Sequence, residues 1–166
     1  MLKRVLSILC GCVCSLVISQ AAVAKVLVLN PDFEQGWYAW KKSGSTAISG
    51  EGRDDESSAK ITGESGRFEQ EVKVQPNTDY TLAVFLKGSG KIGAIVTTEA
   101  TEEQKRINKF QEFSLQTYAK DDYNGDWEVI EVDFNSGISD KVTIFGAYRK
   151  GGQGRFDRFR VKRKRE

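Results

Sequence analysis

Two short segments each combine an aromatic ring with a cation on one side of a predicted strand. Phe85 and Lys87 share the parity opposite to the alternating aliphatic residues of segment 80–87, and Phe145 and Arg149 lie opposite in parity to the aliphatic residues at 142 and 144. A flat ring can cover the apolar C–H surface of a sugar, and a neighbouring cation can bind a carboxylate or sulfate. These four residues are therefore candidates for binding an anionic sugar chain. A one-residue bulge would instead turn Phe85 or Phe145 into the core.

Metal chemistry is restricted by what the chain lacks. It has no histidine, and its three cysteines, Cys10, Cys12 and Cys14, all lie within the first 24 residues. Histidine and cysteine are the usual ligands of zinc and other transition metals. Carboxylate and carbonyl oxygens remain, and these favour hard cations such as calcium.

The first 24 residues read as a cleaved export signal. Lys3 and Arg4 precede an almost wholly apolar run over residues 5–18, and the small residues 22–24 suit a cleavage site. Cleavage there would start the mature chain at Lys25 and remove every cysteine. Residues 25–166 are long enough for one domain with a core and too short for two. The predicted location is therefore the periplasm or the external medium.

The last 18 residues form a basic tail. Residues 149–166 contain nine lysine and arginine residues against Asp157 and Glu166, whereas the whole chain has a formal net charge of only +2. Such a tail could contact an anionic polysaccharide or an anionic membrane surface. It could equally be the solvated end of a last strand in which Phe159 and Val161 point inward. Nucleic acid is not expected as a partner of an exported chain.

Short strand patterns separated by turn residues dominate the rest of the chain. Segments 26–29, 67–74, 80–87, 91–98, 130–134 and 142–145 show strand patterns, most of them with apolar residues at alternate positions, and glycine- or proline-containing turns fall between them. Residues 41–58 read as a long loop pair, and residues 99–109 are the only helix-like stretch. The pattern predicts an all-β fold, an antiparallel β-sandwich of the jelly-roll kind.

Several motifs together resemble carbohydrate-binding modules with a galactose-binding-like β-sandwich, of the family four, nine and twenty-two kind. The motifs are NPDFE at 30–34 with Trp37 and Trp40 behind it, SSAKITG at 57–63, FEQEV at 68–72 followed by PNTDY at 76–80, Trp127, and RFDRFRV at 155–161. The resemblance implies that the first and last strands lie side by side. It also implies that Trp40 and Trp127 pack in the core.

The resemblance further implies a structural calcium ion between the terminal strands, with Asp32, Glu34 and Asp157 as ligands. Residues 51–56 could supply further oxygens. The alternative is that Glu34 and Asp157 simply pair with Arg155 or Arg158. In such modules, binding residues also fall in the stretch before the Trp127 strand, which adds Tyr118 and Tyr123 to the sugar-binding candidates.

Three classes of function fit the sequence. The first is an exported, non-catalytic protein that binds a polysaccharide or oligosaccharide. The second is a small polysaccharide lyase or hydrolase, for which Glu131 and Asp133 share one strand face and a tyrosine with an arginine could act on a uronate. The third is a structural or adhesion module that binds a protein partner. The absence of histidine, and of cysteine after residue 24, leaves few acid–base candidates for the second class.

Overall fold

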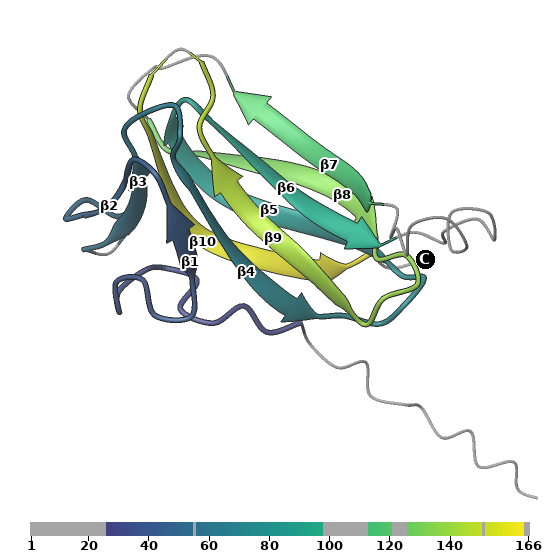
Figure 1. The fold of residues 1–166 in the computed structure, drawn as a ribbon. Coiled ribbons are helices and arrows are strands. Elements are labelled where there is room, and N and C mark those ends of the chain that lie inside the picture. The colour runs from purple at the N-terminus through teal and green to yellow at the C-terminus, as the bar shows by residue number, and fades with distance from the viewer. Residues whose placement is uncertain (1–25, 55, 98–112, 121–125, 151, 165–166) are drawn as a thin grey trace, which may run out of the picture.

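The computed structural model describes residues 26–54, 56–97, 113–120, 126–150 and 152–164, with only the backbone described for 113–120. Two five-stranded antiparallel sheets face each other (Figure 1). Sheet A has the order β1 (Lys41–Ser43), β4 (Arg67–Lys73), β9 (Lys141–Ala147), β6 (Gly90–Thr97) and β7 (Phe113–Lys120). Sheet B has the order β2 (Thr46–Ser49), β3 (Ser58–Ile61), β10 (Gly154–Arg163), β5 (Asp79–Gly88) and β8 (Glu128–Asn135). The prediction of an antiparallel β-sandwich is confirmed.

The alternating sequence pattern becomes an alternating burial pattern. In β5 the residues Tyr80, Leu82, Val84 and Leu86 are buried, and the residues between them are more exposed. The same rule holds in β4, where Phe68, Gln70 and Val72 are buried. One side of each strand therefore fills the space between the sheets, as period-two patterning requires.

Three strands depart from the sequence-based prediction. Residues 41–49 contain β1 and β2 instead of a loop, because they pair with β4 and β3; β1 is wholly polar, and β2 has two apolar residues, Ala47 and Ile48. Residues 113–120 form β7, paired with β6 over eight positions. The apolar residues of this segment change parity between Leu115 and Tyr118, so no single apolar face marks it as a strand in the sequence. Residues 26–29, predicted as a strand, run alongside β4 without strand pairing.

An aromatic cluster joins the two sheets. Phe68 of sheet A lies 5.3 Å and 5.7 Å, ring centroid to ring centroid, from Phe156 and Phe159 of sheet B. Phe33 and Trp40, from the loop before β1, contact Phe159 at 6.0 Å and 4.9 Å. Trp40 is buried in the core, as predicted. Trp127 is only half-buried and lies outside the core cluster, so that prediction is wrong: it precedes β8 with the parity of the outward residues Val129 and Glu131.

The loop 30–40 is held together by Asn30. Its side-chain amide donates to the carbonyl oxygens of Gly36 and Tyr38, and its Oδ1 accepts from the backbone N–H of Gln35. The indole N–H of Trp40 donates to the Asn30 carbonyl oxygen at 2.9 Å. Asn30 has a φ of 45°, a left-handed conformation that asparagine tolerates better than most residues. The NPDFE motif therefore shapes a loop that closes one end of the sandwich.

The two ends of the described chain meet at an irregularity in β10. The register of β10 with β5 shifts between Asp157 and Arg160, and Arg158 has a φ of 52°. The Phe159 backbone N–H donates to the Pro31 carbonyl oxygen at 3.0 Å. The prediction that the first and last segments lie side by side is confirmed, although the first one is not a strand.

The basic tail is largely the end of β10. Phe159 and Val161 point into the core, while Arg160, Lys162 and Arg163 are exposed, as a solvated last strand requires. Lys164 beyond it forms an ion pair with Asp133 at 2.7 Å. No helix in the described ranges is long and apolar enough to cross a membrane.

Candidate functional site

The outer face of sheet B is covered by the loop 51–57. Lys87 and Arg155 lie directly opposite each other in β5 and β10, and both bind the Glu51 carboxylate, at 2.6 Å and 3.2 Å. The guanidinium of Arg53 lies 3.9 Å from the centroid of the Phe85 ring. Phe85 and Lys87 do face away from the core, as their parity predicts, but this loop occupies both side chains.

The outer face of sheet A carries the other predicted aromatic residue. Phe145 is only 2% exposed, yet it is not part of the core cluster between the sheets. The register of β9 is continuous and sets Phe145 opposite Glu69 on β4 and Gly93 on β6. The Arg67 guanidinium lies over the Phe145 ring, 4.1 Å from its centroid, and the Arg67 Nε–H donates to Glu69 Oε2 at 2.9 Å. The sequence-based candidates Phe85 and Phe145 therefore lie on opposite outer faces.

Small side chains flank this arginine–phenylalanine pair. Side chains directly opposite each other in an antiparallel sheet lie on the same face. Arg67 is opposite Ser43 on one side and Ala147 on the other, and Ala147 is opposite Lys91. Across the centre of sheet A the outer face therefore runs from Arg67 over Ala147 to Lys91. Arg67 and Lys91 are separated by two strand spacings, about 10 Å.

The outer face of sheet A has more positive than negative charge. Its described outward side chains include five cations and two carboxylates: Lys41, Arg67, Lys73, Lys91 and Lys141 against Glu69 and Glu71. Both carboxylates are paired, Glu69 with Arg67 and Glu71 with Lys141, each at 2.9 Å. The hydrogen bond from Lys141 to Glu71 raises the pKa of Lys141, so this lysine remains charged. Lys41, Lys73 and Lys91 form no ion pair within the described ranges.

Three further candidates lie elsewhere. Arg149 lies two residues beyond the end of β9, and not on the strand itself. Tyr118 lies within β7, opposite Ile92 in register; its side chain falls outside the description. Tyr123 lies outside the described residues. Arg67 was missed because only the pairing of β4 with β9 reveals its position over Phe145.

The predicted metal ligands all lie where the loop 30–40, the loop 51–57 and β10 converge. Asp157 is fully buried, and its Oδ2 accepts from the Arg53 backbone N–H at 2.8 Å. Glu34 Oε1 accepts from the Ser57 N–H at 2.7 Å, and Asp32 Oδ1 accepts from the Glu34 N–H at 3.5 Å. Arg158 forms an ion pair with Asp54 and Arg155 forms one with Glu51. Among the described residues, which do not include residue 55, no three acidic side chains form a group that could hold a metal. The calcium site stays a prediction.

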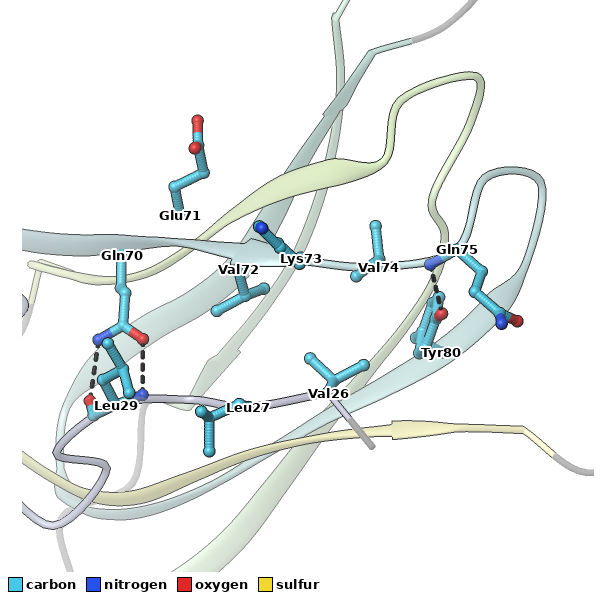
Figure 2. A pocket seen from close by; sticks show the side chains of 10 residues that line it. All are labelled: Val26, Leu27, Leu29, Gln70, Glu71, Val72, Lys73, Val74, Gln75 and Tyr80. Carbon is cyan, nitrogen blue, oxygen red and sulfur yellow. Dashed lines mark hydrogen bonds between the residues drawn. The ribbon is translucent and has the colours of Figure 1, made fainter. Parts of the chain in front are cut away.

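A cavity of about 480 Å³ lies between residues 26–29 and β4 (Figure 2). Its walls are mainly aliphatic. At one end the Gln70 side chain joins β4 to residues 26–29, because it accepts from the Leu29 N–H and donates to the Leu29 carbonyl oxygen. The only aromatic residue that lines it, Tyr80, is 2% exposed, and its hydroxyl accepts from the Gln75 N–H. The cavity therefore presents no open aromatic face to a sugar.

Comparison with known families identifies the class of protein. Residues 25–145 match the family profile of the carbohydrate binding domain CBM_4_9. The chain therefore belongs to this carbohydrate-binding domain family, as the motifs predicted. Comparison with curated proteins finds no match.

Solved structures agree on the fold. The structure of TmCBM61 in complex with β-1,4-galactotriose is 20% identical, with a TM-score of 0.54, over 85% of this chain and 100% of the other. The CBM22-1 xylan-binding domain of Paenibacillus barcinonensis Xyn10C is 13% identical, with a TM-score of 0.61, over 86% and 97%. The K3 cleaved adhesin domain of Lys-gingipain from Porphyromonas gingivalis is 14% identical, with a TM-score of 0.54, over 83% and 97%. At these identities the likeness supports the shared sandwich alone.

The ion pairs of Glu51 with Lys87 and Arg155 over sheet B, called here the Glu51 clamp, predict a stability that depends on pH. The hydrogen bond from Lys87, with the charges of Arg155 and Lys87, lowers the pKa of Glu51. A carboxylate with a lowered folded-state pKa stabilises the fold above its unfolded pKa of about 4.3, and this contribution is lost as pH falls through the folded pKa. We expect Glu51→Gln to lower the free energy of unfolding at pH 7 by about 0.5–1 kcal/mol, since the pair is partly exposed.

Urea denaturation at pH 7 and at pH 3.5 checks this expectation. The difference between wild type and Glu51→Gln should shrink at the lower pH. Glu131→Gln is the matched control, because Glu131 is exposed on the same face and has no ion pair among the described residues. Equal destabilisation at both pH values would contradict the clamp.

Proposed function

We propose that this chain is an exported binding protein that holds a polysaccharide on the outer face of sheet A and performs no chemical step on it. Membership of the carbohydrate-binding family supports the general class. Sheet A supports the location, because the loop 51–57 covers much of the opposite outer face. The similar structure bound to β-1,4-galactotriose supports a glycan ligand in general.

The observation that carries the proposed preference for an anionic polysaccharide is the charge on sheet A. Its two carboxylates are already paired, whereas Lys41, Lys73 and Lys91 have no ion pair among the described residues. Cations without local partners attract an anionic polymer and make its binding depend on salt. A uronate- or sulfate-bearing chain therefore fits this face better than a neutral one.

A catalytic role finds little support at the carboxylates that were considered for it. Asp133 accepts hydrogen bonds from Lys164 and Thr81, which lower its pKa. A carboxylate held ionised in this way is a poor general acid. Glu131 is exposed on the outward face of β8, and its neighbour across the strand pair is Ala83. We therefore propose binding without catalysis.

Affinity electrophoresis tests this proposal directly. The full chain should be retarded in native gels that contain an anionic polysaccharide such as polygalacturonate, and less in gels that contain a neutral galactan. Lys91→Glu should weaken the retardation by about tenfold in Kd at low salt, because it reverses a charge on the proposed face.

Lys162→Glu is the matched control, because Lys162 is an exposed strand lysine on the outer face of sheet B. If Lys91→Glu and Lys162→Glu weakened polymer binding equally, the polymer would bind elsewhere or the effect would come from net charge alone. Unretarded migration in every gel would overturn the proposed function for those polymers. Release of reducing ends or unsaturated products would overturn the non-catalytic assignment.

We propose calcium as a structural ion near Asp157. The donor set available there is oxygen only: a buried carboxylate from β10, the acidic loop residues Asp32 and Glu34, and backbone carbonyls of two adjoining loops. This set suits a hard cation. A bound calcium would neutralise the buried Asp157 charge and tie the first described segment to the last strand.

Thermal unfolding with Ca²⁺ or with EDTA checks the calcium proposal. At a Ca²⁺ concentration about 100 times Kd, the midpoint should rise by roughly 5–10 °C over the EDTA sample. Asp157→Asn should remove this rise, whereas Asp140→Asn, an exposed turn residue, should retain it. Coincident curves for wild type in EDTA and in millimolar Ca²⁺ would rule out the ion.

We propose export through the signal at residues 1–24. The charged start, the apolar run and the small residues at 22–24 support it, and the family match begins at residue 25. Protein recovered from the periplasm or medium of a bacterial host should have Lys25 at its N-terminus by mass spectrometry. Recovery of the chain only in the cytoplasm, with Met1 retained, would contradict export.

A further inference from the structure

A second, smaller cavity lies where β1 meets β4 on the outer face of sheet A. It has a volume of about 280 Å³ and is lined by Lys41, Lys42, Ser43, Arg67 and Glu69. The pairing of Lys41 with Glu69 and of Ser43 with Arg67 puts these four side chains on the same face. The cavity therefore adjoins the row that leads from Arg67 to Lys91.

The cavity lining is cationic. On the outer face it contributes two positive charges, Lys41 and Arg67, and one carboxylate, and that carboxylate is already bound to Arg67 Nε. Lys41 has no ion pair with any described residue. Lys42 is opposite Phe68 in register, so its side chain starts on the inner side of the sheet, where its ammonium lies 5.9 Å from the centroid of the Trp37 ring. The positive charges of Lys41 and Arg67 around one small space favour an anion there.

Arg67 is held in a fixed orientation for such an anion. One face of its guanidinium lies on the Phe145 ring, and its Nε–H donates to Glu69. These two contacts restrain the plane of the group, while its two terminal amino groups form no hydrogen bond with any described residue. A restrained guanidinium edge matches the two oxygens of a carboxylate or sulfate and loses little entropy on binding.

We propose that this β1–β4 cavity binds the compact oxyanion of a glycan, a uronate carboxylate or a sulfate ester, with Arg67 as the bidentate donor. Lys41 supplies further positive charge on the same face, and the Ser43 hydroxyl can donate a further hydrogen bond. That the oxyanion belongs to a glycan rests on the proposed function. The anion chemistry follows from the cavity itself, and it makes Arg67 the residue that selects charged over neutral sugars.

Side-chain NMR of the full chain tests the cavity without a polymer. In ¹⁵N-labelled protein, the Nε–Hε signal of Arg67, assigned as the one missing in Arg67→Lys, should shift on titration with sodium sulfate and with galacturonate. Titration with galactose should leave it unchanged. The two anions distinguish a sulfate ester from a carboxylate as the preferred group.

Two variants connect the cavity to polymer binding. Arg67→Lys retains the charge but loses the planar fork, and should weaken binding of the preferred anionic polysaccharide by about tenfold. Lys41→Gln, an exposed change that avoids the Phe145 contact, should weaken it by about threefold and reduce its salt dependence. Lys162→Gln is the matched control: Lys162 is an exposed strand lysine on the outer face of sheet B, and it is not in the cavity lining.

The outcomes separate this proposal from the proposed function. An Arg67 Nε–Hε signal that does not shift with either anion would overturn the proposed anion site in the cavity. Polymer binding that is unchanged in both Arg67→Lys and Lys41→Gln also overturns it, while leaving a polysaccharide-binding face in place. An Arg67 shift with both anions, lost in Lys41→Gln but without retardation by any polysaccharide, supports the cavity and overturns the proposed function instead.

Discussion

The architecture depends on an aromatic cluster that joins both sheets to the loop 30–40. Phe68 belongs to sheet A, Phe156 and Phe159 belong to sheet B, and Phe33 enters from the loop with contacts of 5.5 Å to Phe68 and 6.0 Å to Phe159. Such ring pairs contribute about 0.5–1.5 kcal/mol each beyond the burial of their area. Phe33 adopts a left-handed φ of 60°, a costly backbone state for a bulky residue that complete burial of its ring can offset.

This cluster also decides which outer face remains available. Inserting Phe33 and Trp40 fixes the loop 30–40 against β10, where the Pro31 carbonyl accepts from the Phe159 N–H. The adjacent irregularity in β10 sets Asp157 opposite Phe85, where the loop 51–57 docks through Arg53 and Glu51. Sheet B is thereby covered around Phe85. At the corresponding position on sheet A, Arg67 lies over Phe145.

The sequence predicted the sandwich because its period-two pattern is strong in the central strands. The alternation in segments 80–87 and 130–134 gave both the strands and their inward faces, and it correctly turned Phe85 and Phe145 away from the core. It failed where pairing, and not composition, makes a strand: β1 is polar and has three residues, β2 has only four residues, and the apolar residues of β7 change parity. The Lys-Lys-Ser sequence of β1 has no strand pattern of its own, and it forms a strand only because it pairs with β4.

The candidate site was less predictable for the same reason. Parity tells which side of a strand a residue faces, but it does not tell which sheet the strand joins. Phe85 and Phe145 were therefore indistinguishable in the sequence, although the loop 51–57 covers one and Arg67 covers the other. Arg67 and Phe145 are 78 positions apart, and only the β4–β9 register brings them into contact. The outward Arg67–Glu69 spacing on one strand was the single local signal that could have drawn attention to this position.

An arginine over a buried ring changes what the face can recognise. Phe145 is 2% exposed, so it offers no bare aromatic surface on which a neutral sugar could stack. A ligand on this face contacts the Arg67 guanidinium. A neutral sugar that displaces water from the guanidinium gains no charge–charge interaction to compensate for the lost hydration. An anionic group gains charge-assisted hydrogen bonds that repay this desolvation. Specificity is a difference between two affinities, and in the proposed function the covering arginine would lower the affinity for neutral sugars and raise the affinity for anionic ones. Structures with the same sandwich therefore inform the architecture of this protein, while the proposed preference among sugars depends on the Arg67–Phe145 contact.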